Sequence, residues 1–231
     1  MIQVIASTIV DAIIVIVSIL LIKKIKPNRS NLLNLAFGTF WLGVAGIYFF
    51  AGLTDLSGMF TSIWLSRLSF LITISLAVIP VVCLALFLSA ISFKGKTILV
   101  LPAILGLLGI LYIYFIVLTP ITGPVIGWTV KYYSQSSEAI TLIQYLGYSC
   151  FTMVMLLALT AFRSKKTSTF IQFNSVAVSM GLFFLAGYLD LLGNTEIQTV
   201  LIRSVIILAA LIGYFGFSPS INLIKLFHRF L

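Results

Sequence analysis

Residues 97–118 read TILVLPAILGLLGILYIYFIVL and contain no charged side chain. A helix of roughly 20 predominantly apolar residues crosses the hydrocarbon core of a bilayer, and this stretch has the required length and composition. A soluble domain cannot hide many runs of this kind. The stretch therefore predicts a transmembrane helix.

The same pattern recurs along the rest of the chain. Of its 231 residues, 61% are apolar and 8% are charged, whereas a soluble domain carries about 25% charged residues. The sequence therefore predicts an all-α polytopic protein of the cell membrane, a single seven-helix transmembrane domain over residues 1–231. The predicted spans are residues 2–22, 32–53, 64–93, 97–118, 139–162, 170–192 and 199–223.

Charges in the connections predict the orientation. Basic residues follow spans one, three, five and seven, whereas the opposite connections hold mainly acidic residues, with Lys131 among them. Cytoplasmic loops are rich in Lys and Arg, so we expect the N-terminus outside and the C-terminus inside. The net charge of +9 is then a topology signal, and we expect no nucleic-acid partner. The inner cations are Lys23, Lys24, Lys26, Arg29, Lys94, Lys96, Arg163, Lys165, Lys166, Lys225 and Arg229.

The first apolar segment is predicted to be a retained span. Its basic residues follow the apolar stretch, and it lacks the basic start and the small-residue cleavage site of a signal peptide.

The outer connection between spans four and five has two interpretations. Residues 119–133 combine Gly and Pro turn signals with alternating β-branched and aromatic residues, a pattern typical of a β-hairpin that caps the bundle. The other interpretation is an interfacial loop in which Trp128, Tyr132 and Tyr133 lie at headgroup level. The sequence leaves both open.

Common catalytic and cofactor chemistries lack their residues. The one histidine, His228, lies in the inner tail, and no GxxxxGK[ST] or GxGxxG loop occurs. Residues 200–223 contain no lysine for a retinal Schiff base, so we expect no retinal. Cys83 and Cys150 both lie in apolar runs and suggest neither a disulfide nor a metal site. We therefore expect no enzyme activity, no cofactor and no metal.

Four ionisable residues within or beside the spans form the candidate ligand-binding site. Charged groups in lipid are costly and mark functional sites by default. Ser7 and Asp11 share one face of the first span, and the other three residues lie in the outer part of their spans. One interpretation is an outer polar pocket in which the arginines bind a carboxylate, a phosphate or another anionic ligand. The other is structural, with arginines reaching the headgroups and Asp11 paired with one of them. The four residues are Asp11, Arg67, Asp190 and Arg203.

Other polar residues and prolines within the spans are given structural roles. Hydroxyl and amide groups recur at helical spacing in spans three, five and six, where they are expected to form hydrogen bonds between helices. Pro80 and Pro102 each remove a backbone hydrogen bond and are expected to kink their helices.

Several short motifs resemble the seven-transmembrane sensor region of prokaryotic histidine kinases. Residues 64–71 (WLSRLSFL), the run VIPVVCLALF at 78–87 and the turn Lys94-Gly95-Lys96 resemble its third helix. The resemblance extends over residues 64–194. Its other motifs are Leu118-Thr119-Pro120 before Trp128, Tyr145-Leu146-Gly147-Tyr148, Gln172, and Leu192-Gly193-Asn194.

The resemblance implies a receptor-like or sensor-like protein that binds a small or lipidic ligand. The family's output domain would follow the seventh span, where this sequence ends, so we expect signalling to a separate membrane or cytoplasmic partner through the basic inner loops. Those cations equally suit anionic lipid headgroups. The alternative function is a non-catalytic structural subunit of a larger membrane complex. A channel or uniporter comes third, because Asp11 is the one deep acidic group available to line an ion path.

Overall fold

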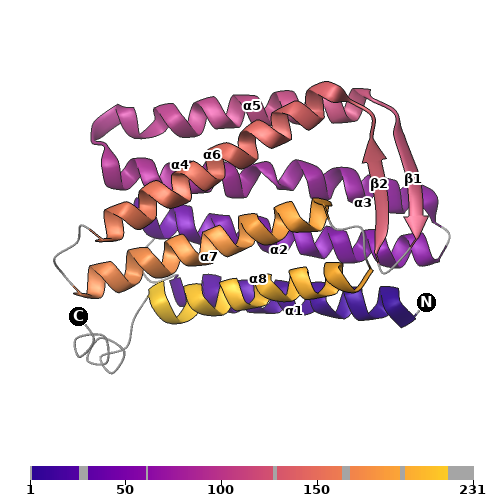
Figure 1. Cartoon of the computed structure of the whole chain (residues 1–231), viewed down its shortest axis with the longest axis horizontal. Helices are drawn as coiled ribbons and strands as arrows, with labels where there is room; N and C mark the ends of the chain where they lie inside the picture. Colours follow the sequence, from indigo (N-terminus) through magenta and orange to yellow (C-terminus); the bar gives the residue numbers. More distant parts are fainter. Residues whose placement is uncertain are drawn as a thin grey trace.

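The computed structural model describes residues 2–25, 31–60, 62–126, 129–162, 167–192 and 196–217. Long helices run side by side, and a β-hairpin lies at the same end of the bundle as the N-terminus (Figure 1). The predicted helical architecture is confirmed for these ranges. The helices are α1 (Ile2–Ile25), α2 (Leu32–Met59), α3 (Ile63–Leu76), α4 (Val78–Ser92), the 3₁₀ turn η1 (Gly95–Leu99), α5 (Val100–Leu118), α6 (Ser137–Phe162), α7 (Thr167–Leu192) and α8 (Glu196–Phe217).

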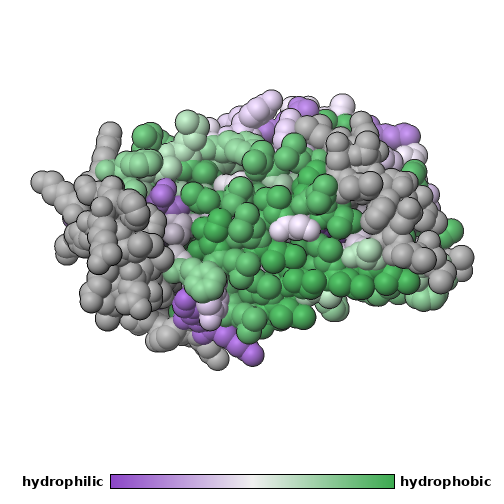
Figure 2. Space-filling view, turned by 60° about the horizontal axis from the view of Figure 1, so that its bottom comes forward, coloured by the Kyte–Doolittle hydropathy of each residue, from purple (hydrophilic) through white to green (hydrophobic). Residues whose placement is uncertain are grey.

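The described helices have the length and composition of membrane spans. Six helical segments meet both criteria, and the shorter apolar segment Val200–Gly216 lies in α8, where the seventh span was predicted. The face in Figure 2 is predominantly hydrophobic over its described surface. These features are those of a multi-pass membrane protein. The six segments are Val4–Ile25, Leu32–Met59, Ile63–Ser92, Gly95–Leu118, Ser137–Phe162 and Phe170–Asp190.

The third predicted span consists of two helices, α3 and α4, which meet at Ala77. Pro80 has no backbone N–H, and its ring crowds the carbonyl four residues earlier, that of Leu76. The span predicted to kink at Pro80 is therefore interrupted at the preceding turn. Pro102 lies in the first turn of α5, where a helix tolerates proline because that N–H has no helical acceptor.

Helix α2 lies at the centre of the bundle and packs against α1, α3 and α4, while α8 packs against α1 and α7. Aromatic rings fill the core between these helices. Phe40 contacts Phe183 and Phe184 with ring centroids 5.3 and 5.9 Å apart, and Phe37 contacts Phe87 at 6.2 Å. The part of the bundle away from the hairpin therefore has a densely packed aromatic core.

Of the two interpretations of residues 119–133, the structure has the hairpin. Strands β1 (Ile121–Ile126) and β2 (Val130–Ser134) pair in antiparallel fashion, with Thr122 opposite Tyr133 and Val125 opposite Lys131. Pairing is irregular between Thr122 and Val125, where Gly123 has φ = +134°, a backbone conformation that favours glycine. Of the three aromatic residues named for the interfacial loop, Tyr132 is buried and Tyr133 exposed.

At the end opposite the hairpin, α1 and α8 are joined by Lys24. Its Nζ donates a hydrogen bond to the carbonyl oxygen of Tyr214 and lies 4.0 Å from the centroid of the Tyr214 ring. Lys94 and Lys96 are exposed at this end, around η1. Several residues used in the sequence predictions lie outside the described ranges: Lys26, Arg29, Trp128, Arg163, Lys165, Lys166, Lys225, His228 and Arg229.

Candidate functional site

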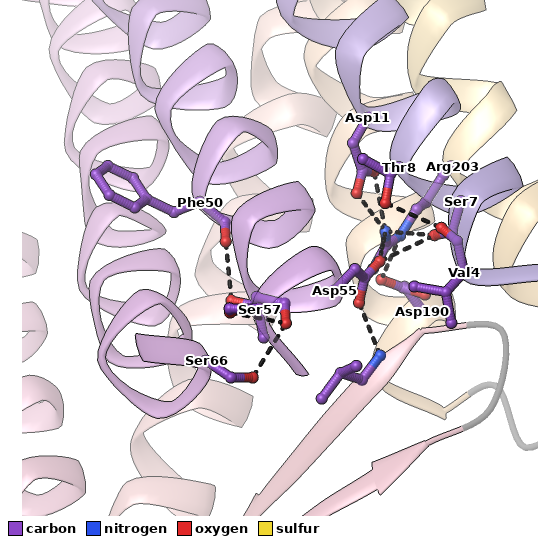
Figure 3. Close-up of polar contacts among 12 residues, drawn as sticks. Val4, Ser7, Thr8, Asp11, Phe50, Asp55, Ser57, Ser66, Asp190 and Arg203 are labelled. Carbon is purple, nitrogen blue, oxygen red and sulfur yellow. Dashed lines mark hydrogen bonds and ion pairs between the residues drawn. The ribbon is translucent and has the colours of Figure 1, made fainter. Parts of the chain in front are cut away.

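A buried arginine gathers acidic groups from three other helices at the hairpin end. Arg203 on α8 donates from Nη1 to Asp11 on α1, at 2.9 Å from Oδ1 and 2.7 Å from Oδ2. The same nitrogen lies 3.5 Å from Oδ2 of Asp55 on α2, and Nε lies 3.6 Å from Oδ2 of Asp190 on α7. Figure 3 shows these side chains converging between the helices. We call Asp11, Asp55, Asp190 and Arg203 the charged cluster.

Ser7 connects two members of the charged cluster. It lies one helical turn before Asp11, so both side chains lie on the same face of α1. Arg203 Nη1 donates to Ser7 Oγ at 3.0 Å, and the Ser7 hydroxyl donates to Asp55 Oδ2 at 3.2 Å. The sequence had predicted the shared face of Ser7 and Asp11, and the structure confirms that it points into the bundle.

The hairpin forms part of the same hydrogen-bond network. The backbone N–H of Val130, the first residue of β2, donates to Asp55 Oδ1 at 2.7 Å (Figure 3). The Val130 side chain packs on Gly58, where an added Cβ would lie 2.7 and 2.9 Å from the two Val130 methyl carbons. Tyr132 packs on Phe70 of α3, with ring centroids 5.1 Å apart. Asp55 thus joins the hairpin to the charged cluster.

Burial makes the balance of charge in the cluster important. Asp11 and Asp55 are each 1% exposed and Arg203 is 7% exposed, whereas the side chain of Asp190 is 24% exposed. Burying an ionised group costs several kcal/mol unless a partner compensates it. Three carboxyl groups surround one guanidinium group, so the cluster has more acidic than basic groups. It is better suited to hold a proton or a cationic group than an anion.

The edge of the cluster at Asp190 is less completely bonded than its centre. Among the described residues, neither Asp190 Oδ1 nor Arg203 Nε forms a hydrogen bond, and the 3.6 Å from Nε to Asp190 Oδ2 is too long for one. Asp190 is also the most exposed acidic member. Both unbonded atoms are themselves buried, so an additional polar group would reach this edge of the cluster through the exposed part of the Asp190 side chain.

The structure brings together three of the four predicted site residues. Asp11, Asp190 and Arg203 meet in the cluster, and Arg203 is the partner of Asp11. Arg67 does not join them, because it lies on an exposed face of α3 and takes part in none of the ion pairs formed by the described residues. The predicted pair of arginines for an anionic ligand is therefore not assembled.

Asp55 is a member that sequence reasoning missed. The second span was predicted to end near residue 53, which left Asp55 in an outer loop, whereas α2 continues to Met59. The hydroxyl of Thr54 donates to the carbonyl of Phe50 at 2.8 Å. Thr54 therefore has its hydrogen-bond partner within α2, and the helix continues beyond the apolar run. The spacing of seven residues from Tyr48 to Asp55, which places both on one face of a continuing helix, was the available signal.

Two of the hydroxyl groups predicted to join helices do so. Ser66 Oγ on α3 donates to the carbonyl of Thr54 on α2 at 3.0 Å, and Ser179 Oγ on α7 donates to that of Ala209 on α8 at 2.7 Å. In contrast, Thr152 bonds to a carbonyl of its own helix. Within the described ranges, no three His, Cys, Asp or Glu side chains are arranged to hold a metal ion.

Comparison of the sequence with models of known protein families finds no match, and comparison with curated protein sequences finds none either. The resemblance of residues 64–194 to the sensor region of histidine kinases stays a prediction.

Proposed function

We propose that the chain crosses the cell membrane seven times, with its N-terminus outside and its C-terminus inside. The six candidate spans and the apolar segment of α8 support this count. Lys23 and Lys24 end α1, and Lys96 lies in η1, at the end of the bundle opposite the hairpin (Figure 1). An excess of Lys and Arg marks the cytoplasmic side. The charged cluster and the hairpin then lie at the outer end.

In this orientation we infer a receptor-like or sensor-like protein that responds to a ligand at its outer end. The observation that carries the proposal is the charged cluster, because a single guanidinium group joins α8 to α1, α2 and α7. Any ligand that competes for one carboxylate changes the forces on several helices at once. Such a ligand shifts the equilibrium between helix arrangements by its difference in affinity for them.

The chemistry of the cluster favours a ligand with a positively charged group. Asp190 is the accessible acidic member, and an ammonium or guanidinium group on a small or lipidic molecule would pair with it. This differs from the anionic ligand that two neighbouring arginines would have favoured. Arg67 is exposed and apart from the cluster, so it serves as a control residue.

The packing of α1 and α8 offers a route for a signal toward the cytoplasm. These helices are joined at the outer end by Asp11 and Arg203 and at the inner end by Lys24 and Tyr214. The two contacts on α1 are separated by about 20 Å along the helix. A displacement of α8 at the cluster would therefore change the inner contact. The partner that receives it would bind at the basic inner end.

The proposal is tested by ligand-dependent thermal stability of the purified protein in lipid nanodiscs. We expect a stabilising amine within a panel of cationic metabolites and lipids, and loss of its effect in Asp190→Asn. Arg67→Gln, at an exposed position outside the cluster, should retain the effect. The proposal fails if no panel member shifts the unfolding temperature of the unchanged protein. It also fails if Asp190→Asn and Arg67→Gln respond identically.

Two other functions have weaker support. A channel or uniporter needs a continuous polar lining, whereas inward of the cluster the core is packed with rings such as those of Phe40 and Phe183. A non-catalytic structural subunit of a larger complex needs a surface for partner helices, and α6 offers one. Purification in mild detergent distinguishes this role, because a subunit would be recovered with other proteins in fixed stoichiometry.

A further inference from the structure

Helix α6 exposes hydrogen-bonding side chains where a membrane span normally exposes aliphatic ones. Tyr145 and Tyr148 are 58% and 69% exposed, and Gln144 is exposed beside them. The neighbouring α5 differs, since its exposed residues are aliphatic apart from Tyr114. The large exposed apolar residues of α5 are Val100, Ile104, Leu107, Ile110, Leu111, Tyr114, Val117 and Leu118.

The exposed polar groups of α6 fall into two classes. The hydroxyls of Thr141 and Thr152 donate to the carbonyls of Ser137 and Tyr148, four residues earlier in the same helix, at 2.9 and 3.0 Å. In contrast, within the described part of the chain, the side chains of Gln144 and Tyr148 form no hydrogen bond. Lipid tails offer neither donors nor acceptors, so these groups need hydrogen-bond partners beyond the described part of the chain.

The depth of these residues limits what those partners are. Helix α6 runs over 26 residues from Ser137 to Phe162, which is about 39 Å at the helical rise, against about 30 Å of hydrocarbon. Tyr148 lies near the middle of the helix, and Gln144 lies about 9 Å inward of Glu138. Water and headgroups therefore reach Tyr148 poorly, and side chains of another transmembrane helix reach it well.

We propose that this face of α6 is the contact surface of a homodimer in the membrane, with Gln144, Tyr145 and Tyr148 bonding across the interface. All copies of a membrane protein insert in one orientation, so a two-fold axis along the membrane normal brings each residue opposite its own copy. An amide and a hydroxyl each contain both a donor and an acceptor, so each pairs with itself.

Charge does not oppose a second copy on this face. Between Ala139 and Phe162, α6 contains no charged residue, so no like charges meet when the face packs against itself. Hydrogen bonds between polar side chains of neighbouring helices are an established source of association in membranes. The dimer surface is separate from the charged cluster, which α1, α2, α7 and α8 form.

The experiment is oxidative cross-linking in membranes of variants that each carry one introduced cysteine. Met155 is 68% exposed on α6 and lies two turns inward of Tyr148 on the same face, and Leu107 on α5 is 63% exposed. We expect a covalent dimer from Met155→Cys and none from Leu107→Cys. The native thiols of Cys83 and Cys150 are buried, so the unchanged protein gives the baseline.

A second comparison tests the hydrogen bonds themselves. In the Met155→Cys background, Gln144→Leu combined with Tyr148→Phe should lower the cross-linked fraction at least about fivefold. Tyr114→Phe on α5 is the matched control and should leave it unchanged. Equal cross-linking at Met155→Cys and Leu107→Cys overturns the homodimer. The homodimer is also overturned if the Gln144→Leu, Tyr148→Phe double variant cross-links as fully as Met155→Cys alone. A cross-linked product that contains a different protein overturns it as well.

Discussion

Replacement of Arg203 should destabilise the protein far more than neutralisation of Asp11, although the two side chains form one ion pair. Arg203→Leu removes the guanidinium that lies within 4.0 Å of three acidic side chains. Breaking a buried pair by removing one partner costs about 3–5 kcal/mol, and here the loss affects several carboxyl groups together. We expect a loss of stability in this range.

Asp11→Asn leaves Arg203 with two acidic neighbours, Asp55 and Asp190. The amide oxygen still accepts a hydrogen bond from Nη1, so the expected cost is about 1 kcal/mol. Combining Asp11→Asn with Arg203→Leu removes one of the unpaired acidic groups. The double variant should therefore be more stable than Arg203→Leu alone by about 1–2 kcal/mol.

The assay is reversible unfolding by a denaturing detergent in mixed micelles, which gives a free energy of unfolding for each variant. Arg67→Leu is the control, because Arg67 is exposed outside the cluster, and its effect should stay within about 0.5 kcal/mol. An Asp11→Asn cost equal to that of Arg203→Leu would refute the argument from excess acidic groups. Strict additivity of the two changes would refute it as well.

Three further predictions concern the hairpin, the packing and the topology. Gly58→Ala should lower the free energy of unfolding by about 1–3 kcal/mol, because the added Cβ meets the Val130 methyl groups at 2.7 and 2.9 Å. The backbone N–H of Val130 should then exchange its hydrogen faster, and an unchanged exchange rate would contradict this. Ser179→Ala should lower the free energy of unfolding in detergent by about 1 kcal/mol, since the Ser179 hydroxyl bonds to the carbonyl of Ala209. An unchanged free energy would show that Ser179 does not stabilise the contact between α7 and α8. Lys96→Cys should react with a membrane-impermeant maleimide only from the cytoplasmic side, and labelling of intact cells from outside would reverse the proposed orientation.

Hydropathy predicted the main elements because apolar length alone defines a membrane span. It placed the end of the second span too early, since Thr54 and Asp55 end the apolar run while α2 continues to Met59. The turn chemistry around Gly123 left an interfacial loop open beside the hairpin. Its bond to Asp55 joins residues 75 positions apart, and no local pattern reports such a contact.

The two arginines show a second limit of sequence reasoning. Arg67 and Arg203 both lie near the outer ends of predicted spans, and hydropathy treats them alike. Arg203 is buried because its face of α8 packs against α1, where Ser7 and Asp11 offer acceptors. Arg67 lies on a face of α3 that is exposed. This distinction depends on the rotation of each helix against its neighbours.

The ion pair between Asp11 and Arg203 also has a consequence for the biogenesis of the protein. Its partners are separated by 192 positions, which a ribosome translates in roughly 10 to 40 s. During that interval α1 and α2 can insert and pair with Asp11 and Asp55 in proximity but without a guanidinium group between them. The charged-cluster end of this early pair of helices is completed only when α8 arrives, so assembly of the bundle is coupled to synthesis of its C-terminal part.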